Sequence, residues 1–364
     1  MSGLEERVRD AYRAADSWGP DAPPPLPAAR RVRRRGRVLM PLSAAVAVGA
    51  VVAGAVVVGG GEPEGTPPRP AGSAAAHYLV MSVGKGLSVV DSRTGLAPHA
   101  PASSAGKADS ASTAYNAVTR GGKAGEYLAS VSTWSGPPRR SPTHQPPSVP
   151  DSRVHRVTVT ADGRAEIGAP LDWTVSGVLL RMALSPDGRR LAYLRAMDRK
   201  GVPILGVLDL ASMRHREWPL RTTETPFSRR GLAWRPDGLE LVFTLRDAVL
   251  GFDPATGRER TLVPGKGAPG VIDSAVPEAG GLTVAVANGK KVRLFRYLDG
   301  RWSKPLVALP GCGGVTVFTR ASDGRTLLLG RDSAACSEAS RLYAVRDGQV
   351  QRLYSGGTFR SAAW

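Results

Sequence analysis

Five histidines and a set of aspartates are the residues of this 364-residue chain whose side chains could act as acids, bases or metal ligands. The histidines are His77, His99, His144, His155 and His215. They stand far apart in the sequence, and no two of them have the i, i+4 spacing of a helical metal site. We therefore expect surface or structurally satisfied histidines, and neither a metal ion nor a general base built from a local motif.

The stretch Gly265–Gly270 (GKGAPG) has the G-x-G-x-x-G spacing of loops that bind phosphate groups. Such a loop must follow a strand and open a helix whose N-terminus faces the phosphates. Here Pro269 interrupts the helix start, and residues 271–275 (VIDSA) have the composition of a strand. The sequence also contains neither a P-loop motif nor the G-x-S-x-G nucleophile motif, so we expect a plain loop and no bound cofactor.

Three aspartates, Asp187, Asp237 and Asp323, each precede a glycine and could form a carboxylate acid–base set. The same residue types also make a tight turn between two strands, because Pro fixes φ, Asp accepts hydrogen bonds from its own turn and Gly tolerates positive φ. We assign these residues to structure rather than to catalysis. The predicted turn residues are Pro186, Asp187, Gly188, Pro236, Asp237, Gly238, Asp323 and Gly324.

The turns recur at a nearly constant interval, which indicates repeated units. Counted from Pro186, equivalent positions follow after 50, 41 and 45 residues, at Pro236, Pro277 and Ser322. Short apolar runs rich in Val, Leu, Thr and Tyr separate the turns, and no long segment has helical periodicity. A repeat of this length with about four strands per unit is typical of a β-propeller blade. We predict an all-β fold.

Five complete blades can be assigned along the chain. They cover residues 112–174, 178–221, 229–263, 268–309 and 314–354. Two strands at 78–82 and 87–91 and one strand at 359–364 remain. Pairing the last strand with the first two would complete a sixth blade and close the ring, which removes exposed sheet edges. We predict a six-bladed propeller over residues 77–364, with seven blades as the alternative if one hairpin is assigned to the wrong blade.

A hydrophobic segment precedes the repeats. Residues 38–59 contain no charge, and a helix of this length covers a hydrocarbon core of about 30 Å at about 1.5 Å per residue. We predict a transmembrane helix at 38–60. A cleaved signal peptide is the alternative, although the apolar run exceeds the usual length of about 7–15 residues. Arginines just before the segment predict that residues 1–37 are cytoplasmic and the propeller extracytoplasmic: Arg30, Arg31, Arg33, Arg34, Arg35 and Arg37.

Two shorter segments lie on either side of the predicted membrane span. Apolar residues recur at helical spacing in residues 3–18, with charges on the other face. The apolar face would contain Leu4, Val8, Tyr12 and Ala15. This helix docks a cytoplasmic partner in one interpretation and lies on the membrane surface in the other. Residues 61–76 are rich in Pro, Gly and Ala, as expected of a linker.

Cys312 and Cys336 are the only cysteines, too few for a zinc site of four thiolates. Both belong to the predicted extracytoplasmic part, where disulfides persist. A disulfide between them would close a loop of about 25 residues and stabilise the fold by about 3 kcal/mol in the chain-entropy model. We predict this disulfide, and two separate reduced thiols are the alternative.

The chain carries a formal charge of +18, to which residues 1–37 contribute nine Arg against five acids. The basic pairs of the remainder lie in separate turns: Arg139-Arg140, Arg189-Arg190, Arg229-Arg230 and Lys290-Lys291. They are not interleaved with aromatic residues, as a nucleic-acid platform would require. We expect no nucleic-acid partner, and a basic surface attracted to anionic headgroups or cell-wall polyanions.

The Pro-Asp-Gly turns at 186–188 and 236–238 resemble those of TolB-like and WD-repeat-like propellers of bacterial envelope proteins. The resemblance covers residues 77–364 and implies architecture only, because propellers with this turn bind sugars, peptides, proteins or cofactors. The Gly-His and Trp-Asp signatures of eukaryotic WD repeats are absent. A membrane anchor followed by a propeller is similar to uncharacterised single-pass envelope proteins of actinobacteria.

We therefore predict a single-pass membrane protein whose extracytoplasmic propeller binds or senses a protein, peptide or glycan at the cell surface, without catalysis. The alternative is a propeller-type hydrolase or lyase with acids and histidines from different blades meeting at the central channel. Two or more carboxylates with a histidine within hydrogen-bond reach at the channel mouth would favour the enzyme, and an apolar or uniformly basic channel would favour binding. A further interpretation makes the ectodomain a regulator that signals through the anchor to the helix at 3–18.

Overall fold

The computed structural model describes most of the predicted propeller and none of the residues before it. The described residues are 78–83, 86–103, 113–134, 149–196, 203–220, 231–245, 248–288, 291–309, 314–321, 326–332, 340–356 and 359–364. The predicted tail with its arginines, the transmembrane helix and the linker lie outside them, as do Cys312, Cys336, Asp323 and Gly324. Within the described ranges, no helix has the length and apolar character needed to span a bilayer.

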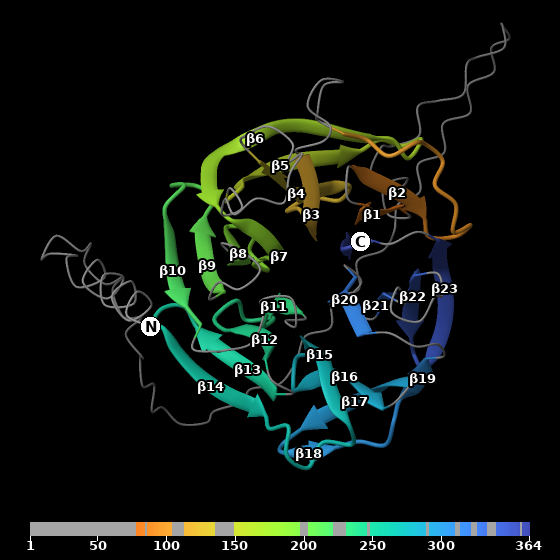
Figure 1. The fold of residues 1–364 in the computed structure, drawn as a ribbon. Helices are drawn as coiled ribbons and strands as arrows, with labels where there is room; N and C mark the ends of the chain where they lie inside the picture. Colours follow the sequence, from red (N-terminus) through yellow and green to blue (C-terminus); the bar gives the residue numbers. More distant parts are fainter. Residues whose placement is uncertain are drawn as a thin grey trace, which may run out of the picture. The chain divides into compact units, whose positions relative to one another are not determined.

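Six antiparallel sheets surround a central axis, each forming one blade (Figure 1). The first blade contains β3 (Thr113–Arg120), β4 (Glu126–Thr133), β5 (Asp151–Val159) and β6 (Ala165–Ser176). The second contains β7 (Val178–Leu184), β8 (Arg190–Ala196), β9 (Ile204–Asp209) and β10 (His215–Pro219). The third contains β11 (Leu232–Trp234), β12 (Leu241–Leu245), β13 (Ala248–Asp253) and β14 (Arg258–Val263).

The remaining blades complete the ring. The fourth contains β15 (Val271–Pro277), β16 (Leu282–Asn288), β17 (Lys291–Leu298), β18 (Arg301–Trp302) and β19 (Val307–Leu309), and both β18 and β19 pair with β17. The fifth contains β20 (Gly314–Arg320), β21 (Leu327–Asp332), β22 (Ser340–Arg346) and β23 (Gln349–Gly356). The closing blade contains β24 (Ser361–Ala363), β1 (Tyr78–Ser82) and β2 (Leu87–Asp91).

The closing blade joins the two ends of the described chain. Strand β24 pairs antiparallel with β1, with Met81 opposite Ala362, and Arg360 donates its backbone N–H to the carbonyl of Ser82 at 3.0 Å. The prediction that the last strand pairs with the first two is therefore confirmed. The seven-bladed alternative is wrong, because the described strands form six sheets. This blade has three strands, and an isolated bridge from Leu87 to Ala102 runs along its outer edge.

Burial is greatest in the second strands and decreases from there to the outer strands, which explains the residue types of these strands. The second strands β8 (RLAYLRA) and β12 (LVFTL) are buried along nearly their whole length. Sheets covered on both faces use such continuous apolar runs. The third strand β5 (DSRVHRVTV) largely alternates buried and exposed positions, and the outer strand β14 (RERTLV) exposes four consecutive residues. The sequence pattern of each strand therefore matches its place in the blade.

The hydrophobic core lies between neighbouring blades rather than in one central mass. The described residues form six clusters, and each cluster combines side chains from two adjacent blades. The closing blade takes part in two of them, one with the first blade and one with the fifth. Because its interfaces are buried like the others, the closing blade is an integral part of the ring.

Polar contacts also fix each blade against the next. The Trp234 indole donates to the carbonyl of Ala183 at 3.0 Å, and the Arg190 guanidinium lies 4.7 Å from the centroid of the same indole. Arg190 also donates to the carbonyl of Gly238 at 2.7 Å. These contacts tie the second blade to the third, so Arg190, one of the basic residues noted in the sequence, has a structural role.

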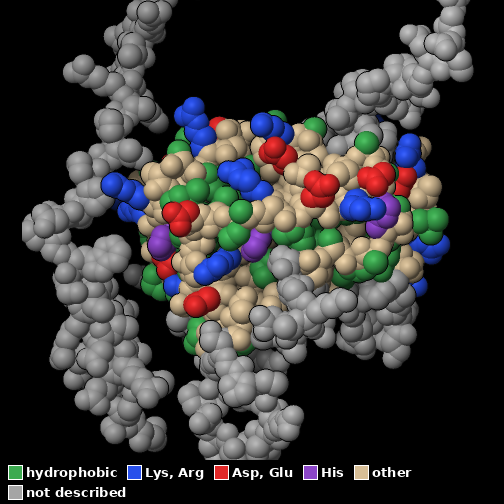
Figure 2. All heavy atoms as spheres, turned by 90° about the horizontal axis from the view of Figure 1, so that it is seen from above, with side chains coloured by type: hydrophobic (Ala, Val, Ile, Leu, Met, Phe, Trp, Pro, Cys, Tyr) green, Lys and Arg blue, Asp and Glu red, His purple; other side chains and the backbone are tan. Residues whose placement is uncertain are grey.

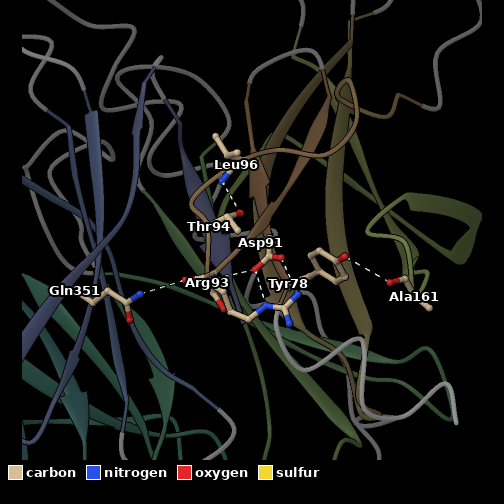
Figure 3. A network of polar contacts seen from close by, with 8 residues as sticks. Tyr78, Asp91, Arg93, Thr94, Leu96, Ala161 and Gln351 are labelled. Atoms are coloured by element: carbon tan, nitrogen blue, oxygen red, sulfur yellow. Dashed lines mark hydrogen bonds and ion pairs between the residues drawn. The ribbon is translucent and has the colours of Figure 1, made fainter. Parts of the chain in front are cut away.

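Figure 3 shows the contacts that hold the outer part of the closing blade between its neighbours. The Tyr78 hydroxyl donates to the carbonyl of Ala161 in the first blade at 3.5 Å. On the other side, the Gln351 amide of β23 donates to the carbonyl of Ser92 at 3.5 Å. A hydrogen bond from Arg93 lowers the pKa of Asp91 at the end of β2.

Candidate functional site

A cavity of about 840 Å³ opens at the end of the central channel where the inner strands terminate. These strands are β3, β7, β11, β15, β20 and β24 (Figure 1). The lining includes the last residue of each inner strand: Arg120, Leu184, Trp234, Pro277, Arg320 and Ala363. We call this space the channel-end cavity. Its volume falls in the range of about 300–1,000 Å³ that is typical of ligand pockets.

The turns that follow the inner strands are built alike in four blades. The backbone N–H of the first turn residue donates to the carbonyl five residues later at 2.7–2.8 Å: Gly121 to Glu126, Ser185 to Arg190, Arg235 to Glu240 and Ala321 to Thr326. In the fourth blade, the Glu278 backbone N–H donates instead to the carbonyl of Gly281 at 2.9 Å. The turn after Pro277, which the sequence aligned with Pro186 and Pro236, is therefore shorter than expected. The turn at 121–126 contains no proline and was not predicted from the sequence.

Of the predicted turn residues of the second and third blades, Pro186, Asp187, Gly188 and Pro236 line the cavity, whereas Asp237 and Gly238 lie outside its lining. Asp187 Oδ1 accepts hydrogen bonds from the Ser185 hydroxyl at 2.5 Å and from the Arg189 N–H at 3.1 Å. The bond from Ser185 is the largest cause of a lowered Asp187 pKa. Asp237 Oδ1 similarly accepts from the Leu239 N–H at 2.9 Å. Each carboxylate is thus engaged by its own turn.

The backbone conformation of these turns requires glycine. Gly188 has φ +71° and Gly238 has φ +69°, values in the left-handed region that glycine adopts without strain. Pro186 and Pro236 are exposed and line the cavity mouth. Asp323 and Gly324 lie outside the described residues, so their predicted turn role stays a prediction.

Three arginines reach the cavity from the inner strands: Arg120 of β3, Arg181 of β7 and Arg320 of β20. All three strands contain a register shift against their partner. The shifts fall between Tyr115 and Val118, between Leu179 and Arg181, and between Val315 and Val317. A bulge adds one residue to a strand and so reverses which of the following side chains point to each face. Simple alternation along the strand therefore does not predict which residues after the bulge face the channel.

Several cations of the lining have partners. Arg320 Nη2 lies 2.8 Å from Glu278 Oε1, and Lys123 Nζ lies 3.9 Å from Glu126 Oε1. Arg181 Nη1 donates to the carbonyl of the preceding residue at 2.7 Å. Burial alone would raise the pKa of Glu278, but hydrogen bonds from Thr283 and Arg320 outweigh burial and hold this pKa below its usual value. Glu278 therefore stays ionised beside the cavity.

Arg120 is the cation best placed to meet a ligand. Its side chain is half-buried at the end of β3, and no hydrogen bond or ion pair with another described residue engages its guanidinium. Nearby, burial raises the pKa of Tyr127 to about 12, and the charge of Arg120 partly opposes this effect. A positive charge without a carboxylate partner thus borders a partly desolvated space.

The lining as a whole combines positive charge with apolar surface. The cations Arg120, Lys123, Arg156, Arg181 and Arg320 face two carboxylates, Glu126 and Asp187. Apolar lining residues include Val118, Met182, Leu184, Leu232, Val276, Phe318 and Ala362. In contrast, acidic and basic side chains are interspersed on the side of the propeller drawn in Figure 2. The cavity therefore differs in charge from that outer surface.

Both serines of the described lining have hydrogen-bond partners. The Ser185 hydroxyl donates to Asp187 and accepts from the Arg190 N–H at 2.9 Å. The Ser361 hydroxyl exchanges hydrogen bonds with the backbone of Val118 at 3.1 and 3.2 Å. No histidine is among the lining residues that the structure describes. The described lining thus holds two side-chain carboxylates without a histidine and is neither wholly apolar nor uniformly basic, so it meets neither criterion set from the sequence.

The described histidines lie elsewhere. His99 Nε2 is 3.1 Å from the carbonyl oxygen of Asp162, and His155 Nδ1 is 3.0 Å from that of Gly168. The Trp173 indole donates to His215 Nδ1 at 3.3 Å. His77 and His144 are outside the described residues. Across the described ranges, no three His, Cys, Asp or Glu side chains are grouped as a metal site would require.

The glycine-rich stretch at 265–270 is a loop, as expected. It joins β14 to β15, and Ala268 donates its N–H to the carbonyl of Gly265 at 3.1 Å. Strand β15 rather than a helix follows this loop, so the loop lacks the helix N-terminus that a phosphate-binding loop of this type uses.

The channel-end arginines are the functional candidates that sequence reasoning missed. The basic pairs were examined because they are adjacent in sequence, whereas Arg120, Arg181 and Arg320 come from three separate repeats. One signal was available. Arg120 and Arg320 each immediately precede the turn that follows an inner strand, so aligning the blades on these turns would have placed both at the same end of the channel.

Comparison with known proteins gives fold-level similarity only. No protein-family model and no curated protein matches the sequence. Among solved structures, a chain of the nidogen/laminin complex is similar at TM-score 0.49 and 12% identity, with 79% of this chain and 97% of that chain covered. TolB from Acinetobacter baumannii gives 0.48 and 13%, with 80% and 67% covered. A chain of the mitotic checkpoint complex gives 0.45 and 11%, with 86% and 92% covered. The likeness to TolB and to these other propellers lies in architecture.

Proposed function

We propose that this chain is a membrane-anchored, extracytoplasmic propeller that binds a protein, peptide or glycan at the cell surface without catalysis, and that the ligand occupies the channel-end cavity. The observation that carries this proposal is the lining of the cavity. Five cations from three blades and an apolar wall converge there, while the hydroxyls of Ser185 and Ser361 bond to a turn carboxylate and to backbone. Such a space supports recognition.

The alternative of a hydrolase or lyase has no comparable support. Hydrolysis by a covalent route needs a nucleophile within hydrogen-bond reach of a base. A lyase needs a poised acid and base near the bond that breaks. Among the described lining residues, Ser361 bonds only to backbone, and Ser185 bonds to Asp187. That carboxylate also accepts from the Arg189 N–H of the same turn, and its lowered pKa, caused first by the bond from Ser185, makes it a weak base.

The binding proposal can be tested by site-specific photo-crosslinking in the host envelope. A benzophenone amino acid placed at Ala233, which lines the cavity from the middle of β11, should give a covalent adduct on illumination. The matched control is Val271, which is 53% exposed at the first residue of β15 and therefore at the other end of the channel. Adducts from position 271 alone, or from neither position, would contradict the proposal.

The membrane part of the proposal rests on the uncharged segment at 38–60 and the arginines before it. Protease added to intact cells should digest the polypeptide after residue 76 and leave the tail at 1–37 protected. Protection of the propeller from protease that remains active on a known surface protein would show that the assigned topology is wrong.

A further inference from the structure

We propose that the channel-end cavity takes an acidic peptide segment, with Arg120 as the residue that selects for its negative charge. This inference rests on the proposed function and names the chemistry of its ligand. Charge complementarity is the first argument. Counted over side chains alone, five cations against two carboxylates, or three with Glu278 beside Arg320, give the lining an excess of positive charge.

The position of Arg120 is the second argument. It ends strand β3 and is followed by Gly121 and Gly122, and space is open beside Gly122 because a Cβ built there would meet no atom within 4 Å. A half-buried guanidinium presents several N–H donors in one plane, which suits a carboxylate. Partial desolvation strengthens such a contact relative to one on the open surface.

The shape of the cavity favours a peptide over a membrane surface. Arg181 comes from the middle of β7, three residues before the strand ends, so part of the positive charge is recessed below the turns. The turns at 121–126 and 185–190 and the residues Pro236 and Pro277 form the rim around it. A flat layer of headgroups would contact this rim, whereas a single extended chain can enter.

The chemistry of the lining favours a peptide over a glycan. The described lining contains no Asn or Gln, two of the side-chain types that hydrogen-bond sugar hydroxyls with both a donor and an acceptor. It does contain Leu184 and Ala233, which are partly exposed, beside the buried Met182, Leu232 and Phe318, and apolar ligand side chains would gain from contact with this wall. The fitting ligand is therefore a short segment in which acidic residues alternate with apolar ones.

Fluorescence anisotropy with the purified full chain tests this inference. The probe is a short labelled peptide in which Glu alternates with Leu and Ala, and the comparison peptides carry Gln or Lys in place of Glu. We expect the Glu peptide to bind, the others to bind at least about tenfold more weakly, and the affinity to fall as salt is raised. Equal affinity for the three peptides would overturn the inference.

Two variants assign the selectivity to Arg120. Arg120→Gln should weaken the Glu peptide about tenfold, as expected for one lost charge-assisted contact. Arg120→Glu should reverse the preference towards the Lys peptide. The control Arg214→Gln changes an exposed arginine of the β9–β10 turn outside the cavity and should alter the affinity less than twofold. Equal weakening by Arg120→Gln and Arg214→Gln would show nonspecific attraction and overturn the assignment.

Binding of two other anionic ligands is compared with that of the Glu peptide, to test whether the cavity selects a peptide. Vesicles containing phosphatidylglycerol and a soluble polyuronate should bind more weakly than the Glu peptide, and Arg120→Gln should change their binding less than twofold. Arg120-dependent binding of either one without peptide binding would overturn the peptide assignment. If the Glu peptide fails to bind while the probe at Ala233 still gives adducts, this inference is wrong and the proposed function stands. If Ala233 gives no adduct either, both are wrong.

Discussion

Substitution of Phe359 tests whether the closing blade is an integral part of the ring. Its side chain is 3% exposed, its ring lies edge-on to Tyr354 at a centroid distance of 6.2 Å, and it packs directly on the backbone of Gly330. Truncation of a buried Phe to Ala costs about 3–5 kcal/mol, because transfer free energy is lost and a cavity remains. Since the site is fully enclosed, we expect Phe359→Ala to lower the free energy of unfolding by about 4 kcal/mol.

The control is a matched phenylalanine in an interface that does not involve the chain ends. Phe295 is 5% exposed and lies edge-on to Trp302 at 5.9 Å. Urea denaturation of the full chain, followed by intrinsic fluorescence, should give similar losses for Phe295→Ala and Phe359→Ala. A loss from Phe295→Ala with no change from Phe359→Ala would refute the reasoning, because it would mean that the last strand contributes nothing to the stability of the ring.

A second substitution isolates the contact between Phe359 and Gly330. A Cβ added at Gly330 would lie 2.6 Å from Phe359 Cε2, so Gly330→Ala should destabilise by about 1–3 kcal/mol through overpacking. Phe359→Ala removes the ring that is most in the way, so in that background the same change should cost less, with only the contact to Val317 Cβ at 3.0 Å remaining. Additive effects of the two substitutions would contradict the packing that the structure describes.

Three further predictions concern other parts of the propeller. Arg195→Ala should destabilise by about 3 kcal/mol because it leaves Glu217, now bonded at 2.6 Å, without its cation. Arg195→Met with Glu217→Leu should recover only part of this loss in urea denaturation, because the Tyr193 hydroxyl, which donates to Glu217 at 2.7 Å, loses its acceptor. The folded-state pKa of Glu278 lies below its ordinary value of 4.5, so its stabilising effect is complete above that pH and is lost as pH falls through the lower folded-state pKa. The stability difference between the wild type and Glu278→Gln should therefore shrink in acid, and a difference independent of pH would contradict this. Free-thiol labelling of the unreduced chain should modify neither Cys312 nor Cys336, and labelling of both would exclude the predicted disulfide.

Much of the fold could be predicted because its turns are local. A Pro-Asp-Gly turn is specified by its own residues, so the hairpins at 185–190 and 235–240 and their spacing were visible in the sequence. Ring closure followed from counting the strands left over at the two ends. The hairpin at 121–126 was not identified as another copy of this turn, because it contains glycines and no proline. It nevertheless forms the equivalent hydrogen bond, from the Gly121 N–H to the carbonyl of Glu126.

The cavity could not be predicted because it depends on contacts between repeats. The side chains that enter the channel depend on the register of each inner strand, and the bulges after Leu179 and Val315 displace that register. Arg120, Arg181 and Arg320 therefore look like ordinary surface charges in the sequence. They become a site only when three blades are placed around one axis.

An experimental structure of the full chain with the Glu-containing peptide bound tests the central claim most directly. The account predicts peptide density inside the channel-end cavity, with a ligand carboxylate within hydrogen-bond distance of the Arg120 guanidinium and apolar ligand side chains against Met182 and Leu184. Peptide bound on the outer strands or at the opposite end of the channel, with the channel-end cavity filled only by water, would contradict it.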